Sequence, residues 1–170
     1  DWVAADLLAQ AEHDTAAQSI LVTDSPALAD AVAEAVERQL KVLPRSAIAG
    51  ASWRDHGAII TVKSLDLAMD LANRVAPEHL ELAVADPEAL LLKVRNAGAV
   101  FLGHYTPEAI GDYLGGTNHV LPTARSARYS SGLSVHDFIK HSSILKLGAE
   151  QLAILGGAAV TLAEAEGLGA

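Results

Sequence analysis

An acid and a base stand side by side just after a proline, in the segment APEHLEL at residues 76–82. Proline disfavours the helical conformation at the residue before it, so a helix that leads into this segment should end here. Glu78 and His79 are then expected in a loop or at the first position of a strand, where side chains can face a cleft. A glutamate can activate a water molecule, and a histidine can accept or release protons near neutral pH. The alternative is a solvated loop, because Glu-His pairs are common.

Two further pairs have the residue types of metal ligands. Gln10 and His13 are three residues apart and share a face if both lie on a helix. Asp112 stands in a glycine-rich stretch, with His119 seven residues later. Carboxylate and imidazole groups bind zinc or a similar ion, whereas glutamine is an uncommon ligand. The alternatives are a polar helix end for the first pair, and a turn-forming aspartate with a partly buried histidine for the second.

The elements that must position these residues follow from the apolar pattern. Strand-like runs at residues 19–23, 57–63, 80–84 and 99–103 alternate with helical patterns at residues 2–12, 26–40, 65–75 and 86–94. Ser25 and Ser64 are placed to cap two of the helices. The alternation predicts an α/β fold, with a Rossmann-like, mostly parallel sheet between flanking helices. The chain has no G-x-G-x-x-G turn, so architecture alone does not predict a dinucleotide site.

The pattern changes after Gly103. Residues 111–122 are rich in glycine and polar side chains without a clear period, which is typical of a binding loop. Helical or mixed structure is predicted for residues 135–144 and 150–155, and an amphipathic helix for residues 160–168. We therefore divide the chain into an incomplete Rossmann-like domain (1–123) and a connector with a small helical tail (124–170). The tail is too short to form its own core, so we expect it to pack on a partner subunit or on another part of the protein.

Composition limits the classes of function. The 170 residues carry a net charge of -9 without a basic block, which argues against a nucleic-acid-binding surface. The absence of cysteine excludes disulfides and fits a reducing compartment such as the cytoplasm. No apolar run reaches the roughly 18 residues of a membrane span. The chain opens and closes beside helical patterns, so we expect it to be a piece of a longer protein.

Three segments together resemble the histidinol dehydrogenase family: AADLLAQAEH at residues 4–13, PEHLE at residues 77–81 and GDYLGGTNHVLPT at residues 111–123. The resemblance runs in order over nearly the whole chain. It implies a zinc-dependent, NAD-linked enzyme that oxidises L-histidinol through an aldehyde to L-histidine, the last steps of histidine biosynthesis. It also implies a homodimer with exchanged C-terminal tails.

The resemblance also implies roles for individual residues. Glu78 and His79 match the catalytic pair, in which the histidine takes the hydroxyl proton and the glutamate activates the water that adds to the aldehyde. Three zinc ligands match Gln10, His13 and Asp112. The substrate-binding residues match Gln10, His13, His79, Asp112, His119 and Glu166. A fourth zinc ligand, a histidine, is expected directly after residue 170, and the family's N-terminal part would supply most contacts to NAD. We therefore expect this chain alone to be inactive.

Two other functions stay open at this point. The chain can be a related zinc-dependent dehydrogenase that oxidises another small alcohol, although Glu166 favours an amine-bearing substrate because a carboxylate pairs well with an ammonium group. It can also be a non-catalytic α/β module that binds a metal or a partner protein. A piece cut from an interlocked dimer should expose apolar surface, so we expect association or poor solubility.

Overall fold

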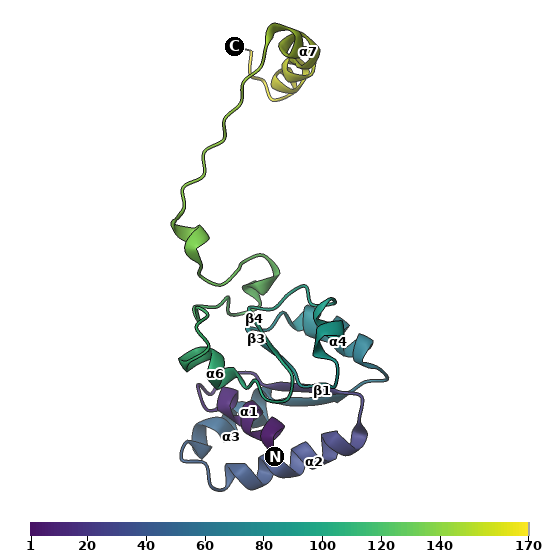
Figure 1. Cartoon of the computed structure of the whole chain (residues 1–170), viewed down its shortest axis with the longest axis vertical. Coiled ribbons are helices and arrows are strands. Elements are labelled where there is room, and N and C mark those ends of the chain that lie inside the picture. The colour runs from purple at the N-terminus through teal and green to yellow at the C-terminus, as the bar shows by residue number, and fades with distance from the viewer. Residues whose placement is uncertain (170) are drawn as a thin grey trace. The chain divides into compact units, whose positions relative to one another are not determined.

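A computed structural model describes residues 1–169 (Figure 1). In chain order the helices and strands are α1 (Trp2–Ala11), β1 (Ile20–Thr23), α2 (Pro26–Leu40), α3 (Ser46–His56), β2 (Ala58–Thr61), α4 (Leu65–Val75), β3 (His79–Leu82), α5 (Pro87–Leu91), β4 (Ala99–Leu102), α6 (Glu108–Tyr113) and α7 (Ala149–Ala165), with 3-10 turns at Ser126–Arg128 and Val135–Phe138. The chain divides into two compact units, Asp1–Ser134 and Val135–Ala170, with Ala170 outside the described residues. The domain boundary at residue 123 stays a prediction.

The four strands pair in parallel, as the sequence predicts. β1 pairs with β2, placing Ile20 opposite Ala58, and β3 pairs with β4, placing His79 opposite Ala99. Within the described residues these are two separate two-stranded sheets. Two parallel neighbouring strands need a crossover connection. Helices α2 and α3 connect β1 to β2, and α5 connects β3 to β4.

Two apolar clusters hold the first unit together. The larger lies where α1, α2 and α3 meet, with Leu8 and Val36 almost fully buried. The smaller joins α4, β3 and α5 through Met69, Leu82 and Leu90. The smaller cluster therefore fixes α4 and β3, the elements on either side of Pro77, and the larger cluster fixes α1, which carries Gln10.

Local signals in the sequence set several helix ends correctly. The hydroxyl of Ser25 accepts the N–H of Leu28, and Pro26 is the first residue of α2. The hydroxyl of Ser64 accepts the N–H of Leu67 at the start of α4. α4 ends at Val75, as the proline rule predicts.

Other predictions for the first unit are wrong or incomplete. α3 is not predicted from the sequence, because its apolar periodicity is weak and is interrupted by Gly50 and the buried Ser52. The expected loop at residues 111–122 begins inside α6, so Gly111 is helical. A Cβ at this position would lie 2.5 Å from the ring of Phe101. The glycine therefore allows α6 to approach β4 closely and does not break the helix.

The second unit also differs from prediction. Residues 135–144, predicted to be helical or mixed, contain a 3-10 turn at Val135–Phe138 followed by chain without regular secondary structure. The two expected helices at residues 150–155 and 160–168 are one helix, α7, which continues through Gly156 and Gly157. No residue of α7 is buried within this unit, and its large apolar side chains, such as Ile154 and Leu162, are exposed.

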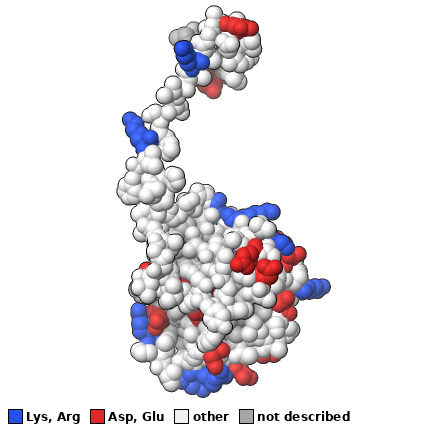
Figure 2. All heavy atoms as spheres, viewed as in Figure 1, with Lys and Arg blue, Asp and Glu red and all other residues white. Residues whose placement is uncertain are grey.

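The surface is mixed in charge. On the face in Figure 2, Lys and Arg side chains are interspersed with Asp and Glu and form no continuous basic area. Among residues 1–169, no helix combines the length and the apolar composition that crossing a membrane requires. The net charge of -9 remains the argument against a nucleic-acid-binding surface.

Candidate functional site

His79 is held at the first position of β3 by the backbone around it. Ala76, the last residue before Pro77, has a left-handed conformation with φ 52°. The N–H of Gly98 donates to the carbonyl oxygen of Pro77 at 3.0 Å. A Cβ at Gly98 would lie 2.6 Å from the carbonyl oxygen of Glu78, so the two segments approach this closely only because residue 98 is glycine.

The ring of His79 contacts two side chains from distant parts of the chain. Its Nδ1 lies 3.2 Å from Oε1 of Gln10, and its Nε2 lies 3.0 Å from Nε2 of His119. The two imidazoles are stacked, with centroids 4.9 Å apart and planes 16° apart. The site therefore brings the end of α1, the start of β3 and the segment after α6 together.

The chemistry of these partners assigns the protons. The side-chain oxygen of Gln10 can only accept, so Nδ1 of His79 donates to it. In a neutral ring, Nε2 of His79 then carries the lone pair, and this is the atom that faces Nε2 of His119. His79 consequently presents its basic nitrogen to the side of the site where His119 lies.

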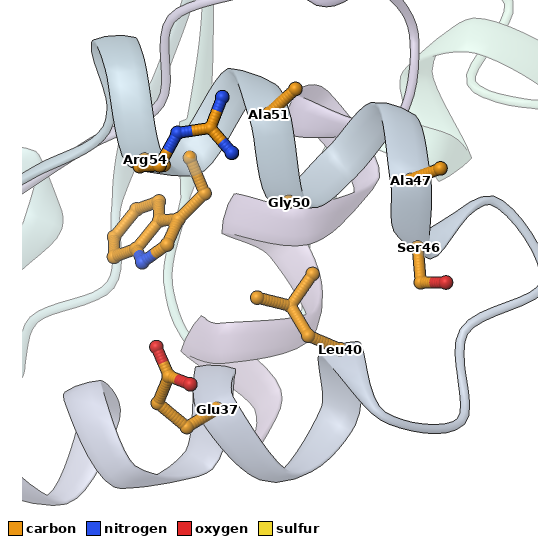
Figure 3. A pocket seen from close by; sticks show the side chains of 8 residues that line it. Glu37, Leu40, Ser46, Ala47, Gly50, Ala51 and Arg54 are labelled. Carbon is orange, nitrogen blue, oxygen red and sulfur yellow. The ribbon is translucent and has the colours of Figure 1, made fainter.

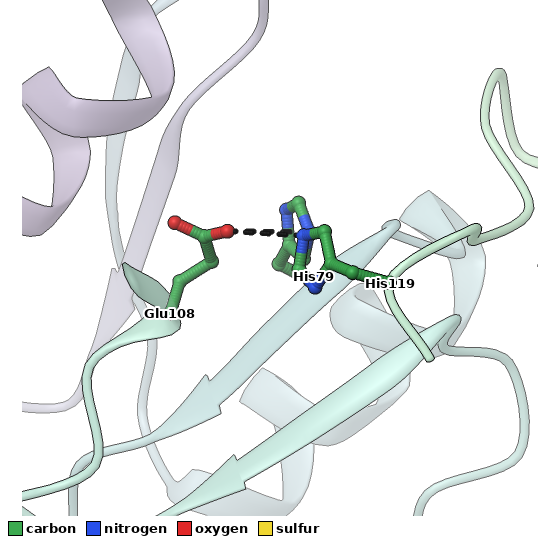
Figure 4. Close-up of side chains that lie close together, drawn as sticks. All are labelled: His79, Glu108 and His119. Atoms are coloured by element: carbon green, nitrogen blue, oxygen red, sulfur yellow. Dashed lines mark hydrogen bonds and ion pairs between the residues drawn. The ribbon is translucent and has the colours of Figure 1, made fainter. Parts of the chain in front are cut away.

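α6 brings two carboxylates close to the histidine pair, and Figure 4 shows the one of Glu108 pointing toward the two rings. Oε1 of Glu108 lies 3.1 Å from Nε2 of His119 and 3.8 Å from Nε2 of His79. Oδ1 of Asp112 lies 3.9 Å from Nε2 of His119. The two acids are four residues apart and therefore share one face of the helix. A positive charge that develops on either imidazole would be stabilised from this face.

Burial lowers the pKa of His79 below its ordinary value. The negative charges of Glu78 and Asp112 oppose this shift, whereas His119 and His13 add to it. Because the net shift is downward, the neutral ring predominates at pH 7. A neutral imidazole is the form that can accept a proton.

A carboxyl pair lies next to these residues. Asp6 on α1 and Glu81 on β3 share a hydrogen bond, and Glu81 also accepts the N–H of Glu108 at 3.0 Å. Burial raises the pKa of Glu81 to about 7, and the charge of Asp6 adds to the shift. Burial also raises the pKa of Asp6. Both shifts have the same cause, because two partly buried carboxyls next to each other disfavour the charged forms.

Most residues singled out from the sequence lie in this site. Gln10, His79, Asp112 and His119 are linked by the distances above. His13 lies in a turn just beyond the end of α1, where its N–H donates to the carbonyl oxygen of Gln10 at 3.3 Å, and not on the helix itself. Asp112 is on a helix, contrary to the predicted loop. Glu166 belongs to the other unit, as the residue that ends α7.

The acids that support the histidines are not predicted from the sequence. Glu108, Glu81 and Asp6 drew no attention, because acidic residues are common on exposed faces. One signal was available: Glu108 precedes Asp112 by four residues, which is the spacing of a shared helix face. That signal was hidden by the assignment of Asp112 to a loop.

Two sets of donor atoms are present for a metal ion. Donor atoms of His79, Glu108 and His119 lie within 4.8 Å of one another, close enough to surround one cation. The family resemblance implies a different set, which is Gln10, His13 and Asp112. The hydrogen bonds described above account for the proximity of the first set without a metal. Gln10 and Asp112 each lie beside the histidine pair, so the second set also borders this site.

One hollow of the first unit lies away from the histidine pair. An open groove of about 640 Å³ runs between α2 and α3, with Leu40, Gly50 and Arg54 among its lining residues (Figure 3). No residue singled out for chemistry lines it. The groove therefore does not compete with the histidine pair as the candidate site.

Comparison with known proteins identifies the family. The family model described as histidinol dehydrogenase matches residues 1–170. The chain belongs to the histidinol dehydrogenase family. The histidinol dehydrogenase of Bradyrhizobium diazoefficiens is 69% identical over 170 residues, which cover 100% of this chain and 39% of the relative. That of Rhizobium meliloti is 67% identical over 168 residues, covering 99% of this chain and 39% of the relative.

A solved structure agrees with this assignment. The crystal structure of histidinol dehydrogenase from Elizabethkingia anophelis matches with a TM-score of 0.82 at 40% identity, covering 98% of this chain and 38% of that one. The predicted α/β fold and the predicted family are confirmed. The chain spans about two fifths of the length of the curated relatives it matches.

Proposed function

We propose that this chain carries the acid–base residues of an enzyme that oxidises L-histidinol to L-histidine through the aldehyde, with NAD as hydride acceptor. The observation that supports this most directly is the state of His79. Its Nδ1 faces an oxygen that can only accept, which leaves Nε2 as a base, and burial keeps the ring neutral. An alcohol oxidation requires such a base for the hydroxyl proton.

His79 takes the hydroxyl proton on Nε2 when the substrate displaces the contact with His119. The imidazolium that forms stays hydrogen-bonded through Nδ1 to Gln10. The carboxylate of Glu108 stabilises its positive charge from 3.8 Å. His79 returns to its neutral state only after this proton is released to solvent, and the pair is then ready for a second oxidation.

Glu78 activates the water in the second half of the reaction. The aldehyde must gain a water molecule before a second hydride can leave, and a carboxylate next to His79 is a suitable base for that water. Its influence on the pKa of His79 supports a position near the ring. An adjacent acid and base therefore serve two oxidations of one bound substrate.

Zinc is proposed at Gln10, His13 and Asp112. An amide oxygen, an imidazole and a carboxylate are compatible with this ion, and two of these residues border the histidine pair. Bound zinc would polarise the substrate's oxygen and hold its nitrogen atoms. His119 and Glu166 are proposed to bind the substrate, with Glu166 pairing with its amine.

NAD is assigned to the part of the enzyme that this chain does not cover. β1 is followed by Asp24, Ser25 and Pro26, where a dinucleotide site would have a glycine-rich turn. We also propose a homodimer with exchanged C-terminal tails, since α7 exposes apolar side chains such as Ile154 and Leu162 within its own unit. A location in the cytoplasm is part of the same proposal.

NADH formation from L-histidinol, with zinc present, tests the proposal. We compare this chain alone with a completed enzyme, in which it replaces the matching 39% of the Bradyrhizobium diazoefficiens relative. We expect activity from the completed enzyme and none from the chain alone. Activity toward another small alcohol in place of histidinol would favour the second function considered above. A folded, zinc-binding and inactive completed enzyme would favour a binding module.

A further inference from the structure

Three carboxyl groups connect the elements that carry the candidate site. Asp6 lies on α1, Glu81 on β3 and Glu108 at the start of α6. Glu81 is the central member, because it shares a hydrogen bond with Asp6 and accepts the N–H of Glu108 at 3.0 Å. One side chain therefore joins three segments that are far apart in the sequence.

Each of these acids lies on the same face of a helix or strand as a residue of the site. Asp6 precedes Gln10 by four residues, and Glu108 precedes Asp112 by four, so each pair shares a helix face. Glu81 follows His79 by two residues, so both point to the same side of β3. A movement of α1 or α6 away from Glu81 would consequently change the distances among Gln10, His79 and the acids of α6.

We propose that Glu81 is a positioning residue, whose contacts with Asp6 and with the main chain of Glu108 set α1 and α6 against β3 and thereby fix the geometry of the His79–His119 pair. Glu81 does not itself bond to either imidazole. The consequence for rate rests on the proposed histidinol oxidation, whereas the consequence for geometry does not. Mutation of a residue that orients a directly acting residue commonly lowers activity by about 10- to 100-fold.

The test compares three variants of the completed enzyme. Glu81→Leu removes both contacts. Glu81→Gln retains an oxygen that can accept the N–H of Glu108 and an amide group that can donate to Asp6. Glu88→Gln changes an exposed acid on α5 and serves as the matched control. We expect Glu81→Leu to lower kcat by about 10- to 100-fold per folded molecule. We expect Glu81→Gln to stay within about threefold of the parent and the control to match it.

Two measurements do not depend on activity. Hydrogen exchange of the Glu108 amide should be slow in the parent and faster in Glu81→Leu. The ¹⁵N shifts of His79 and His119 should change in Glu81→Leu and stay constant in Glu88→Gln. A merely stabilising residue would lower the unfolding temperature without moving the histidine shifts or the kcat of the folded fraction.

The outcomes separate this inference from the proposed function. Without histidinol oxidation by the parent enzyme, the proposed function fails, and the exchange and ¹⁵N data still decide the positioning role. A folded Glu81→Leu variant with parental kcat and unchanged histidine shifts would overturn the inference. An equal loss in the Leu and Gln variants would also overturn it, because charge and not placement would then be responsible. If Glu81→Leu does not fold, Asp6→Leu replaces it, since that change removes only the contact with α1.

Discussion

The two units of this chain obtain their structure in different ways. The unit Asp1–Ser134 has its own apolar clusters and holds its functional side chains by hydrogen bonds between distant segments. The described part of the other unit has a 17-residue helix, α7, without a buried residue. A helix that is apolar on all sides is normally covered by other protein. The first unit can therefore define a site geometry by itself, whereas the second requires a surface outside itself.

The largest expected effect tests whether the first unit carries the catalytic base. Replacing His79 by alanine in the completed enzyme removes the base, so kcat for histidinol oxidation should fall by about 10²- to 10⁴-fold. The matched control is His56→Ala, since His56 is exposed at the end of α3 and belongs to no part of the site. A His79→Ala enzyme within tenfold of the parent would remove His79 from its proposed role.

The next effect tests whether α7 is covered by another surface. Ile154 is 73% exposed within its unit, and burying such a side chain contributes about 1.5–3 kcal/mol. Ile154→Asp should therefore weaken self-association of the completed enzyme by about 10- to 100-fold in sedimentation. Gln151→Glu adds the same charge at a polar position of α7 and should leave association unchanged. Equal association of the parent and both variants would contradict an interface at Ile154.

Local rules were sufficient for part of the fold. Ser25 and Ser64 cap their helices as expected, because an N-cap depends on a few adjacent residues. Pro77 likewise marks the end of α4. The strands of the first unit follow from short apolar runs, and their parallel pairing follows from the helices between them.

The remaining errors in the sequence-based predictions arise where contacts between residues distant in the sequence determine the local structure. Gly111 was interpreted as part of a loop, but its missing side chain admits the ring of Phe101. Glu108 could not be linked to His119 from the sequence, because that distance depends on how α6 packs. The family resemblance supplied the remaining site residues, and their roles stay predictions.

A smaller effect tests how closely the first unit is packed. Gly111→Ala places a methyl group 2.5 Å from the ring of Phe101, so the free energy of unfolding of this chain should fall by about 1–3 kcal/mol. Gly50→Ala is the matched control, because Gly50 is inside α3 with open space around it and should gain up to about 1 kcal/mol. Urea denaturation measures both. Equal stability of the two variants would show that α6 can move away from β4 without cost.

The smallest effect concerns the titration of Glu81. Its pKa in the folded chain is about 7, above the ordinary 4.5, so the fold favours its protonated form. The stabilisation is therefore fully present below about pH 4.5 and is lost as the pH rises through 7. Glu81→Gln does not ionise, so its stability relative to the parent chain should increase by about 1–2 kcal/mol between pH 5 and 8, with allowance for solvent screening. Glu164→Gln, at an exposed acid of α7, should show no such trend. Parallel stability profiles of the parent and Glu81→Gln would mean that Glu81 ionises in the folded chain as it does in the unfolded one, and that its surroundings in the first unit do not disfavour the charged form.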